Sequence, residues 1–182
     1  AGRRNAALLV SHMLNLEFFS PHITRQYSEK DFRKDLKQYL QVAGVEGKSC
    51  VLFLEDYQIV DSTFLQLMNS LIGGGEVPGL YTSEEIDPIL APLADEMRQE
   101  GKYRTLYEYF VSRVKKNLRV VLSLDHSHPF YEVYCASNPA LYTQCHVFWM
   151  QQWSKESLRK VSQIELKEQL EDLPDKSELI EL

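Results

Sequence analysis

The sequence predicts an α/β fold in which a parallel β-sheet is sandwiched by helices. Two apolar runs, at residues 50–54 and 120–124, are too short for free-standing helices and have the length of strands that are buried on both faces. Amphipathic helical patterns alternate with these strands along the chain. This order implies parallel pairing of the strands, connected by crossover helices.

Length and composition are those of one globular domain. A chain of 182 residues can bury a core without disulfides, and 44% hydrophobic with 25% charged residues is ordinary for such a protein. No apolar run reaches the roughly 18 residues of a membrane span, and residues 1–10 lack the long apolar core of a signal peptide. We therefore expect a soluble, intracellular chain with no membrane partner.

Charge and the spacing of cysteine and histidine argue against a nucleic-acid site, a metal site built from cysteine or histidine, and a disulfide framework. The net charge is −6 and the basic residues are scattered, so nucleic acid is not expected as a partner. Cys50, Cys135 and Cys145 show no CxxC spacing, so neither a zinc site nor a disulfide framework is expected. His126 and His128 have the spacing of two ligands on a strand, but the sequence offers no third ligand nearby.

Apolar periodicity and capping residues predict the elements of the first half of the chain. Ser28 is typical of a helix N-terminal cap, and Asp61 or Ser62 caps the helix after the central strand. Glycines end two of the helices, at Gly44 and Gly73. The predicted elements are a helix from about residue 2 to 16, a strand at 16–20, a helix at 28–44, a strand at 50–54 and a helix at 61–73.

The same signals predict the second half. Pro88 and Pro92 are expected to interrupt a helical region, and Pro139 is typical of the first turn of a short helix. The predicted elements are helical segments within 83–101, a helix at 106–117, a strand at 120–124, a short helix from 137, a fourth strand at 145–150 and a helix at 154–170. One domain is expected at 1–170, and 171–182 is expected to be an acidic tail or the start of another element.

Carboxylates follow both buried strands. Glu55 and Asp56 come directly after the strand at 50–54, and Asp125 follows the strand at 120–124. Because open α/β sheets bind ligands beyond the carboxyl ends of their strands, we expect these acids at the mouth of one site. Nucleotide-binding ATPases keep there one acid that holds Mg²⁺ and one that orients the attacking water. Taken alone, carboxylates at a strand end are more often helix caps or solvated edges than parts of a nucleotide site.

The first predicted helix begins with Gly2, Arg3, Arg4 and Asn5. Cations at a helix N-terminus oppose the positive end of the helix dipole, which is reasonable if an anion such as phosphate binds there. The alternative from the residues alone is that Arg3 and Arg4 are solvated side chains.

Three stretches carry a family resemblance: FLEDYQIVDSTF, NSLIGGGEVPGLYT and SNPALYTQCHVFWMQQWS. Together with the glycine-arginine helix start, their order resembles one AAA+ module of a dynein motor heavy chain over about residues 2–170. The resemblance is to the fourth module of the ring, in the form found in the intraflagellar-transport dyneins. It implies the large subdomain of an AAA+ P-loop NTPase, with the first strand of the sheet outside this chain.

The resemblance implies a degenerate nucleotide site that binds ATP or ADP, with or without Mg²⁺. Gly2, Arg3 and Arg4 match the Gly-Lys-Ser/Thr end of a Walker A motif, and Asn5 partly replaces the missing hydroxyl. A guanidinium can pair with phosphate, but its planar fork does not imitate the point charge of lysine. We expect nucleotide binding to survive these changes.

Three further departures from the family pattern point to weak or no hydrolysis. Glu55 and Asp56 match the Walker B acids in reversed order, so Glu55 would hold the metal and the shorter Asp56 would face the water. Asp125 lies where the family's first sensor has asparagine, and a carboxylate there repels γ-phosphate. Gln144 lies at the position of an arginine finger, whose loss removes roughly 10³-fold or more in rate.

The implied role is that of a regulatory module in an ATP-driven, microtubule-based motor that serves retrograde intraflagellar transport in cilia. The implied partners are the neighbouring AAA+ modules of the same heavy chain, the microtubule through the motor's stalk, and dynein accessory chains. The implied locations are cytoplasm, cytoskeleton and cilium. Two alternatives remain: a ligand-free structural module in which Arg3 and Arg4 form salt bridges with carboxylates of a neighbouring module, and an active ATPase that depends on Asp56.

Overall fold

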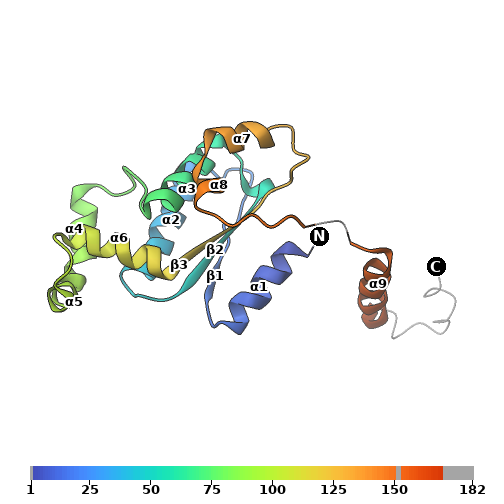
Figure 1. The fold of residues 1–182 in the computed structure, drawn as a ribbon, viewed down its shortest axis with the longest axis horizontal. Coiled ribbons are helices and arrows are strands. Elements are labelled where there is room, and N and C mark those ends of the chain that lie inside the picture. The colour runs from blue at the N-terminus through green and yellow to red at the C-terminus, as the bar shows by residue number, and fades with distance from the viewer. Residues whose placement is uncertain (1, 151–152, 170–182) are drawn as a thin grey trace. The chain divides into compact units, whose positions relative to one another are not determined.

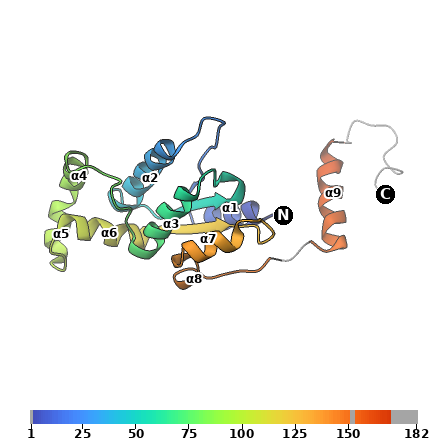
Figure 2. The same ribbon diagram turned by 90° about the horizontal axis from the view of Figure 1, so that it is seen from above.

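The structure, a computed structural model, describes residues 2–150 and 153–169 (Figures 1 and 2). Its contacts divide the chain into one compact unit, Gly2–Val147, and a second unit that begins at Phe148. The first unit contains the sheet and the residues of the candidate site. The second contributes helix α9 (Lys155–Gln169), which confirms the helix predicted at 154–170 over its described part. The predicted tail at 171–182 lies outside the described residues.

Three strands form a parallel sheet in the order β1-β2-β3. They are β1 (Glu17–Phe19), β2 (Cys50–Glu55) and β3 (Leu118–Ser123), with β2 in the centre. The predicted α/β fold with a parallel sheet is confirmed, and each strand lies within two residues of its predicted bounds. Within the part of the chain that the structure describes, β3 pairs only with β2, and the further strand implied by the resemblance stays a prediction.

The two faces of β2 pack against different layers. Cys50, Leu52 and Leu54 belong to the main core, which α2, α3 and α6 share. Val51 and Phe53 alternate with them, so they point to the opposite face, where α1 lies. Burial on both faces explains why the strand is a continuous apolar run rather than an alternating pattern.

Helices α2 (Glu29–Gly44), α3 (Ser62–Gly74) and α6 (Leu106–Asn117) build the main core. Their starts are capped as the sequence predicts: Ser28 forms a capping box with Asp31, and the Asp61 carboxylate accepts the N–H of Thr63 at 2.8 Å. Gly44 lies against the Phe110 ring, so α2 and α6 pack closely there.

Helix α1 (Arg3–Met13) covers the other face of the sheet, as Figure 1 shows. It contacts all three strands through its inner side. Its outer side exposes large apolar residues, among them Leu9, Met13 and, just beyond the helix, Leu14. The helices therefore lie on both faces of the sheet.

A helical extension packs on α6 away from the site. Helix α4 (Ser83–Leu90), the 3-10 turn Ala91–Leu93 and α5 (Ala94–Glu100) form it. The expected interruption at Pro88 is wrong, because α4 continues through this residue. The regular α-helix instead ends at Leu90. Ala91, the residue before Pro92, keeps helical angles (φ −51°, ψ −42°), and the chain continues as a 3-10 turn in which Pro92 has no N–H to donate to an α-helical hydrogen bond.

The predicted fourth strand at 145–150 is wrong. The chain passes from α7 (Tyr131–Ser137) and α8 (Ala140–Thr143) into an irregular segment in which Phe148 is 84% exposed. An apolar run becomes a strand only where a neighbouring strand supplies hydrogen bonds, and the described residues offer none there. α8 itself is held on α3 by Asn69, whose Oδ1 accepts the N–H of Ala140 at 2.9 Å.

Candidate functional site

The start of α1 lies at the carboxyl ends of β2 and β3. Gly2 is the N-cap residue of α1 and has a left-handed backbone, with φ of 79°. Residues with a Cβ rarely adopt this conformation, so glycine suits the position. The first turn carries Arg3 and Arg4 and no acidic side chain. A helix N-terminus of this kind presents unpaired N–H groups and a positive dipole end to an anion.

Arg4 forms an ion pair with Glu55, the last residue of β2. Arg4 Nη1 lies 3.0 Å from Glu55 Oε2, and it also donates a longer hydrogen bond of 3.4 Å to Ser20 Oγ. The guanidinium carbon lies 5.9 Å from the centre of the Phe53 ring, which adds a cation–π contact. The Glu55 side chain is only 17% exposed, against 42% for Arg4. The structure thus joins the predicted Walker A and Walker B residues directly.

Arg3 is tied to the end of the neighbouring strand. Its Nη1 donates to the backbone oxygen of Leu124 at 3.0 Å. The adjacent Asp125 carboxylate accepts the N–H of Ser127 at 3.0 Å. This hydrogen bond, with smaller contributions from electrostatic interactions with His126 and Arg3, lowers the pKa of Asp125. Asp125 is therefore a carboxylate at neutral pH, with Arg3 close enough to act on it electrostatically.

Gln58 positions Glu55, and the sequence analysis missed it. The residue is 2% exposed, and its Oε1 accepts the backbone N–H of Glu55 at 2.8 Å. Its Nε2 donates to the Pro21 oxygen at 2.6 Å and to Ser20 Oγ at 3.2 Å. The one available signal was a glutamine three residues after Glu55, the spacing of a capping box, which the short helix Asp56–Gln58 uses.

Ser123 is a second residue that the sequence analysis did not single out. It pairs with Glu55 in the β2–β3 register, so its side chain points to the same face of the sheet. It is 6% exposed, and its Oγ has no hydrogen-bond partner among the described residues. A buried hydroxyl without a partner is costly, because it has lost its hydrogen bonds to water.

The other predicted site residues make fewer contacts. The Asp56 carboxylate accepts the N–H of its neighbour Tyr57 at 3.0 Å. Asn5 is exposed in the first turn of α1, and Gln144 is exposed just after α8. The roles assigned to these three residues stay predictions.

A metal site is not evident within the described residues. No group of three His, Cys, Asp or Glu residues there has the arrangement to hold a metal ion. The role of Glu55 as a Mg²⁺ ligand therefore stays a prediction. His126 and His128 lie in the loop after β3 and not on a strand, and His128 Nδ1 accepts the N–H of Phe130 at 3.3 Å.

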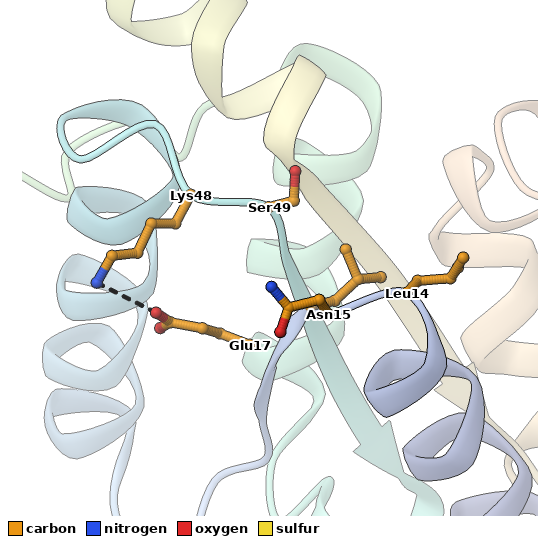
Figure 3. A pocket seen from close by; sticks show the side chains of 6 residues that line it. Leu14, Asn15, Glu17, Lys48 and Ser49 are labelled. Carbon is orange, nitrogen blue, oxygen red and sulfur yellow. Dashed lines mark ion pairs between the residues drawn. The ribbon is translucent and has the colours of Figure 1, made fainter.

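A separate hollow of about 520 Å³ lies at the opposite end of the sheet, where β1 and β2 begin. Figure 3 shows Leu14, Asn15, Glu17, Lys48 and Ser49 around it. Lys48 Nζ lies 3.2 Å from Glu17 Oε1 and 2.9 Å from Glu46 Oε2, so its charge is already paired. This hollow contains none of the predicted nucleotide-site residues.

Comparison with known proteins finds similarity to dynein heavy chains. A family described as the P-loop containing dynein motor region D4 matches residues 1–182. The cytoplasmic dynein 2 heavy chain 1 of Tripneustes gratilla is 47% identical over 174 residues, or 96% of this chain. The proteins of the same name from Mus musculus and Homo sapiens are 48% and 47% identical over 163 residues, or 90% of this chain. This chain spans about 4% of the length of each of these relatives.

None of the described helices has both the length and the apolar character that crossing a membrane requires.

Proposed function

Because this chain belongs to the P-loop containing D4 family of dynein motor regions, we propose that it is a nucleotide-binding regulatory AAA+ module. It binds ATP or ADP and has weak or no hydrolysis of its own. Bound nucleotide acts by stabilising one arrangement of the module over others, which is how a ligand shifts a conformational equilibrium.

The whole protein that we propose around this module follows from its relatives, which are named as cytoplasmic dynein 2 heavy chains. It is an ATP-driven motor on microtubules that serves retrograde intraflagellar transport, in the cytoplasm, the cytoskeleton and the cilium. Its partners are the neighbouring AAA+ modules of the same heavy chain, the microtubule through the stalk, and dynein accessory chains.

The observation that carries the nucleotide proposal is the position of the α1 N-terminus. Gly2, Arg3 and Arg4 lie together beside the carboxyl ends of β2 and β3. This is where parallel α/β sheets bind ligands, and a glycine-led helix start with two cations suits a phosphate chain. The buried Ser123 hydroxyl on the same face adds a hydrogen-bond donor without a partner among the described residues.

Weak hydrolysis follows from how the acids are engaged. Glu55 already neutralises Arg4, and the Asp56 carboxylate accepts the backbone N–H of Tyr57. Asp125 is ionised near the sensor position, where it opposes a negatively charged γ-phosphate. Each feature weakens either the positioning of water or the stabilisation of the transition state.

The test is nucleotide retention by the full heavy chain after the P-loops of its other AAA+ modules have been disabled. Nucleotide released on denaturation is measured for wild type, Arg3→Ala and the matched control Arg25→Ala, since Arg25 is an exposed arginine outside the site. We expect retention in wild type and in the control, and loss in Arg3→Ala. A turnover assay on the same samples, with Asp56→Asn as a variant, tests whether the module is silent.

The alternative function is a ligand-free structural module. Its support is that both cations already have partners within the fold, Arg4 on Glu55 and Arg3 on the Leu124 oxygen. Absence of nucleotide from wild type and variants alike would favour this alternative.

A further inference from the structure

We propose that the Arg4 guanidinium is a built-in substitute for the divalent cation, so that this site binds nucleotide phosphate without Mg²⁺. The inference rests on the proposed nucleotide-binding function. It concerns what neutralises Glu55 and the phosphate chain, and it assigns that task to a side chain of the protein.

The position of the Arg4 side chain is fixed by groups from separate parts of the sheet. Glu55 Oε2 lies 3.0 Å from Nη1, the Phe53 ring lies under the guanidinium, and Ser20 Oγ lies 3.4 Å away. Glu55 is held in turn by Gln58, which accepts its backbone N–H. A cation therefore contacts the one predicted metal-binding carboxylate before any ligand arrives.

The chemistry of Mg²⁺ does not suit this arrangement. Mg²⁺ requires near-octahedral oxygen ligands at about 2.0–2.1 Å, usually a carboxylate and phosphate oxygens with several waters. Here the Glu55 carboxylate is paired with the Arg4 guanidinium. Arg4 also replaces the Ser or Thr whose hydroxyl usually binds Mg²⁺ in P-loop proteins. A metal ion at Glu55 would have to displace the guanidinium or bear its repulsion across a few ångströms.

The guanidinium can serve the phosphate chain directly. Among the described residues, the hydrogen bonds of Arg4 all use Nη1, which leaves Nε and Nη2 free to donate to phosphate oxygens. The side chain is 42% exposed, so these donors are accessible. Guanidinium–phosphate pairs are charge-assisted and often bidentate, so one face of the fork can hold Glu55 while another holds phosphate.

Ser123 supports a phosphate position beside this pair. Ser123 is 94% buried, and its side chain lies on the same face of the sheet as that of Glu55. Its Oγ has no hydrogen-bond partner among the described residues. A phosphate oxygen would accept its O–H and remove the cost of the unpaired hydroxyl. Arg3 of α1, whose guanidinium binds the Leu124 oxygen just after β3, supplies a second positive charge to the same chain of phosphates.

The experiment measures the Kd of a fluorescent ADP analogue for the full heavy chain with the other P-loops disabled, in excess Mg²⁺ and in excess EDTA. Wild type, Arg4→Thr, Arg4→Lys and the control Arg25→Thr are compared, and thermal melting checks that each variant is folded. Arg4→Thr restores the hydroxyl that holds Mg²⁺ in P-loop proteins and releases Glu55 as a ligand.

We expect the wild-type and Arg25→Thr Kd values to change by less than about threefold between the two conditions. Arg4→Thr is expected to bind at least about tenfold more weakly in EDTA than in Mg²⁺, a difference of about 1.4 kcal/mol. Arg4→Lys keeps the charge but not the fork, so it should bind more weakly than wild type in both conditions and remain insensitive to Mg²⁺.

Other results overturn the inference in distinguishable ways. Wild-type binding that requires Mg²⁺ would refute the built-in cation and leave the nucleotide-binding function standing. Equal binding of wild type and Arg4→Thr in EDTA would show that Arg4 is not the substitute. Absence of binding by folded wild type in both conditions would refute the nucleotide function itself, and the inference with it.

Discussion

The ring of Phe32 in α2 stacks on the ring of Phe64 in α3, with centroids 4.4 Å apart and planes inclined by 9°. Both side chains are fully buried, and the Tyr27 ring is inclined by 70° to that of Phe64, with centroids 6.0 Å apart. The pair joins the helices that flank β2 in the chain. Phe64 lies in the first turn of α3, the helix that follows the candidate-site residues Glu55 and Asp56 in the chain.

Phe64→Ala should lower the free energy of unfolding by about 3–5 kcal/mol, through lost apolar burial and the cavity left between α2 and α3. Urea unfolding of the chain measures this change. Phe130→Ala is the matched control, since Phe130 is 57% exposed, and it should change the value by about 0.5 kcal/mol or less. Equal effects of the two substitutions would contradict the assigned core.

Gly44→Ala should destabilise the contact between α2 and α6. A Cβ at Gly44 would collide with the Phe110 ring and lie 3.0 Å from Val114 Cγ2. We expect a loss of about 1–3 kcal/mol from overpacking, measured by urea unfolding. Gly73→Ala is the control, because its Cβ would meet only Ala140 Cβ at 3.7 Å, and the higher helix propensity of alanine should make it neutral or stabilising.

Gln58→Leu should destabilise the chain and loosen Glu55. The substitution leaves the Pro21 oxygen and the Glu55 N–H without their buried partner, at a cost of about 1–3 kcal/mol. Gln66→Leu, on the exposed side of α3, serves as the control. Unfolding measures stability, and hydrogen exchange at Glu55 should accelerate only in Gln58→Leu. Unchanged exchange there would argue against the positioning role.

Cys50 should make stability fall at alkaline pH. Burial, with a smaller contribution from the Glu17 charge, raises the pKa of the Cys50 thiol from 9.0 to about 11. Above pH 9 the unfolded thiol ionises while the folded thiol stays protonated, so its contribution is complete below pH 9 and is lost as pH rises toward 11. One such proton accounts for at most about 1.4 kcal/mol per pH unit.

The check is the pH dependence of the free energy of unfolding in Cys50→Ala against wild type and Cys135→Ala. Cys50→Ala should be less stable at neutral pH but show a shallower decline between pH 9 and 11. Burial also raises the pKa of Tyr39, to about 12, so part of the decline remains in every variant. Parallel slopes in all three proteins would rule out the thiol as a cause.

Local sequence patterns were sufficient to predict most helices and strands, because helix capping and apolar periodicity depend on residues that are close together in the chain. The caps at Ser28 and Asp61, the helical face from Phe32 to Leu40 and the apolar run of β2 all appear in the structure as predicted. Proline was a weaker guide, since Pro88 lies within α4. A single proline loses one hydrogen bond, and packing of α4 against α6 can offset that loss.

The sequence by itself determined the parallel α/β class, the family and the residues at the strand ends, because spacing and motif are properties of the chain. Only the tertiary structure decided that 145–150 is not a strand, that Gln58 is buried, and that Arg4 pairs with Glu55 across 51 residues. Pairing of strands and of charges depends on which distant segments meet in space. No local periodicity or spacing determines which distant segments come into contact, and so the partner of Arg4 could not be predicted from the sequence.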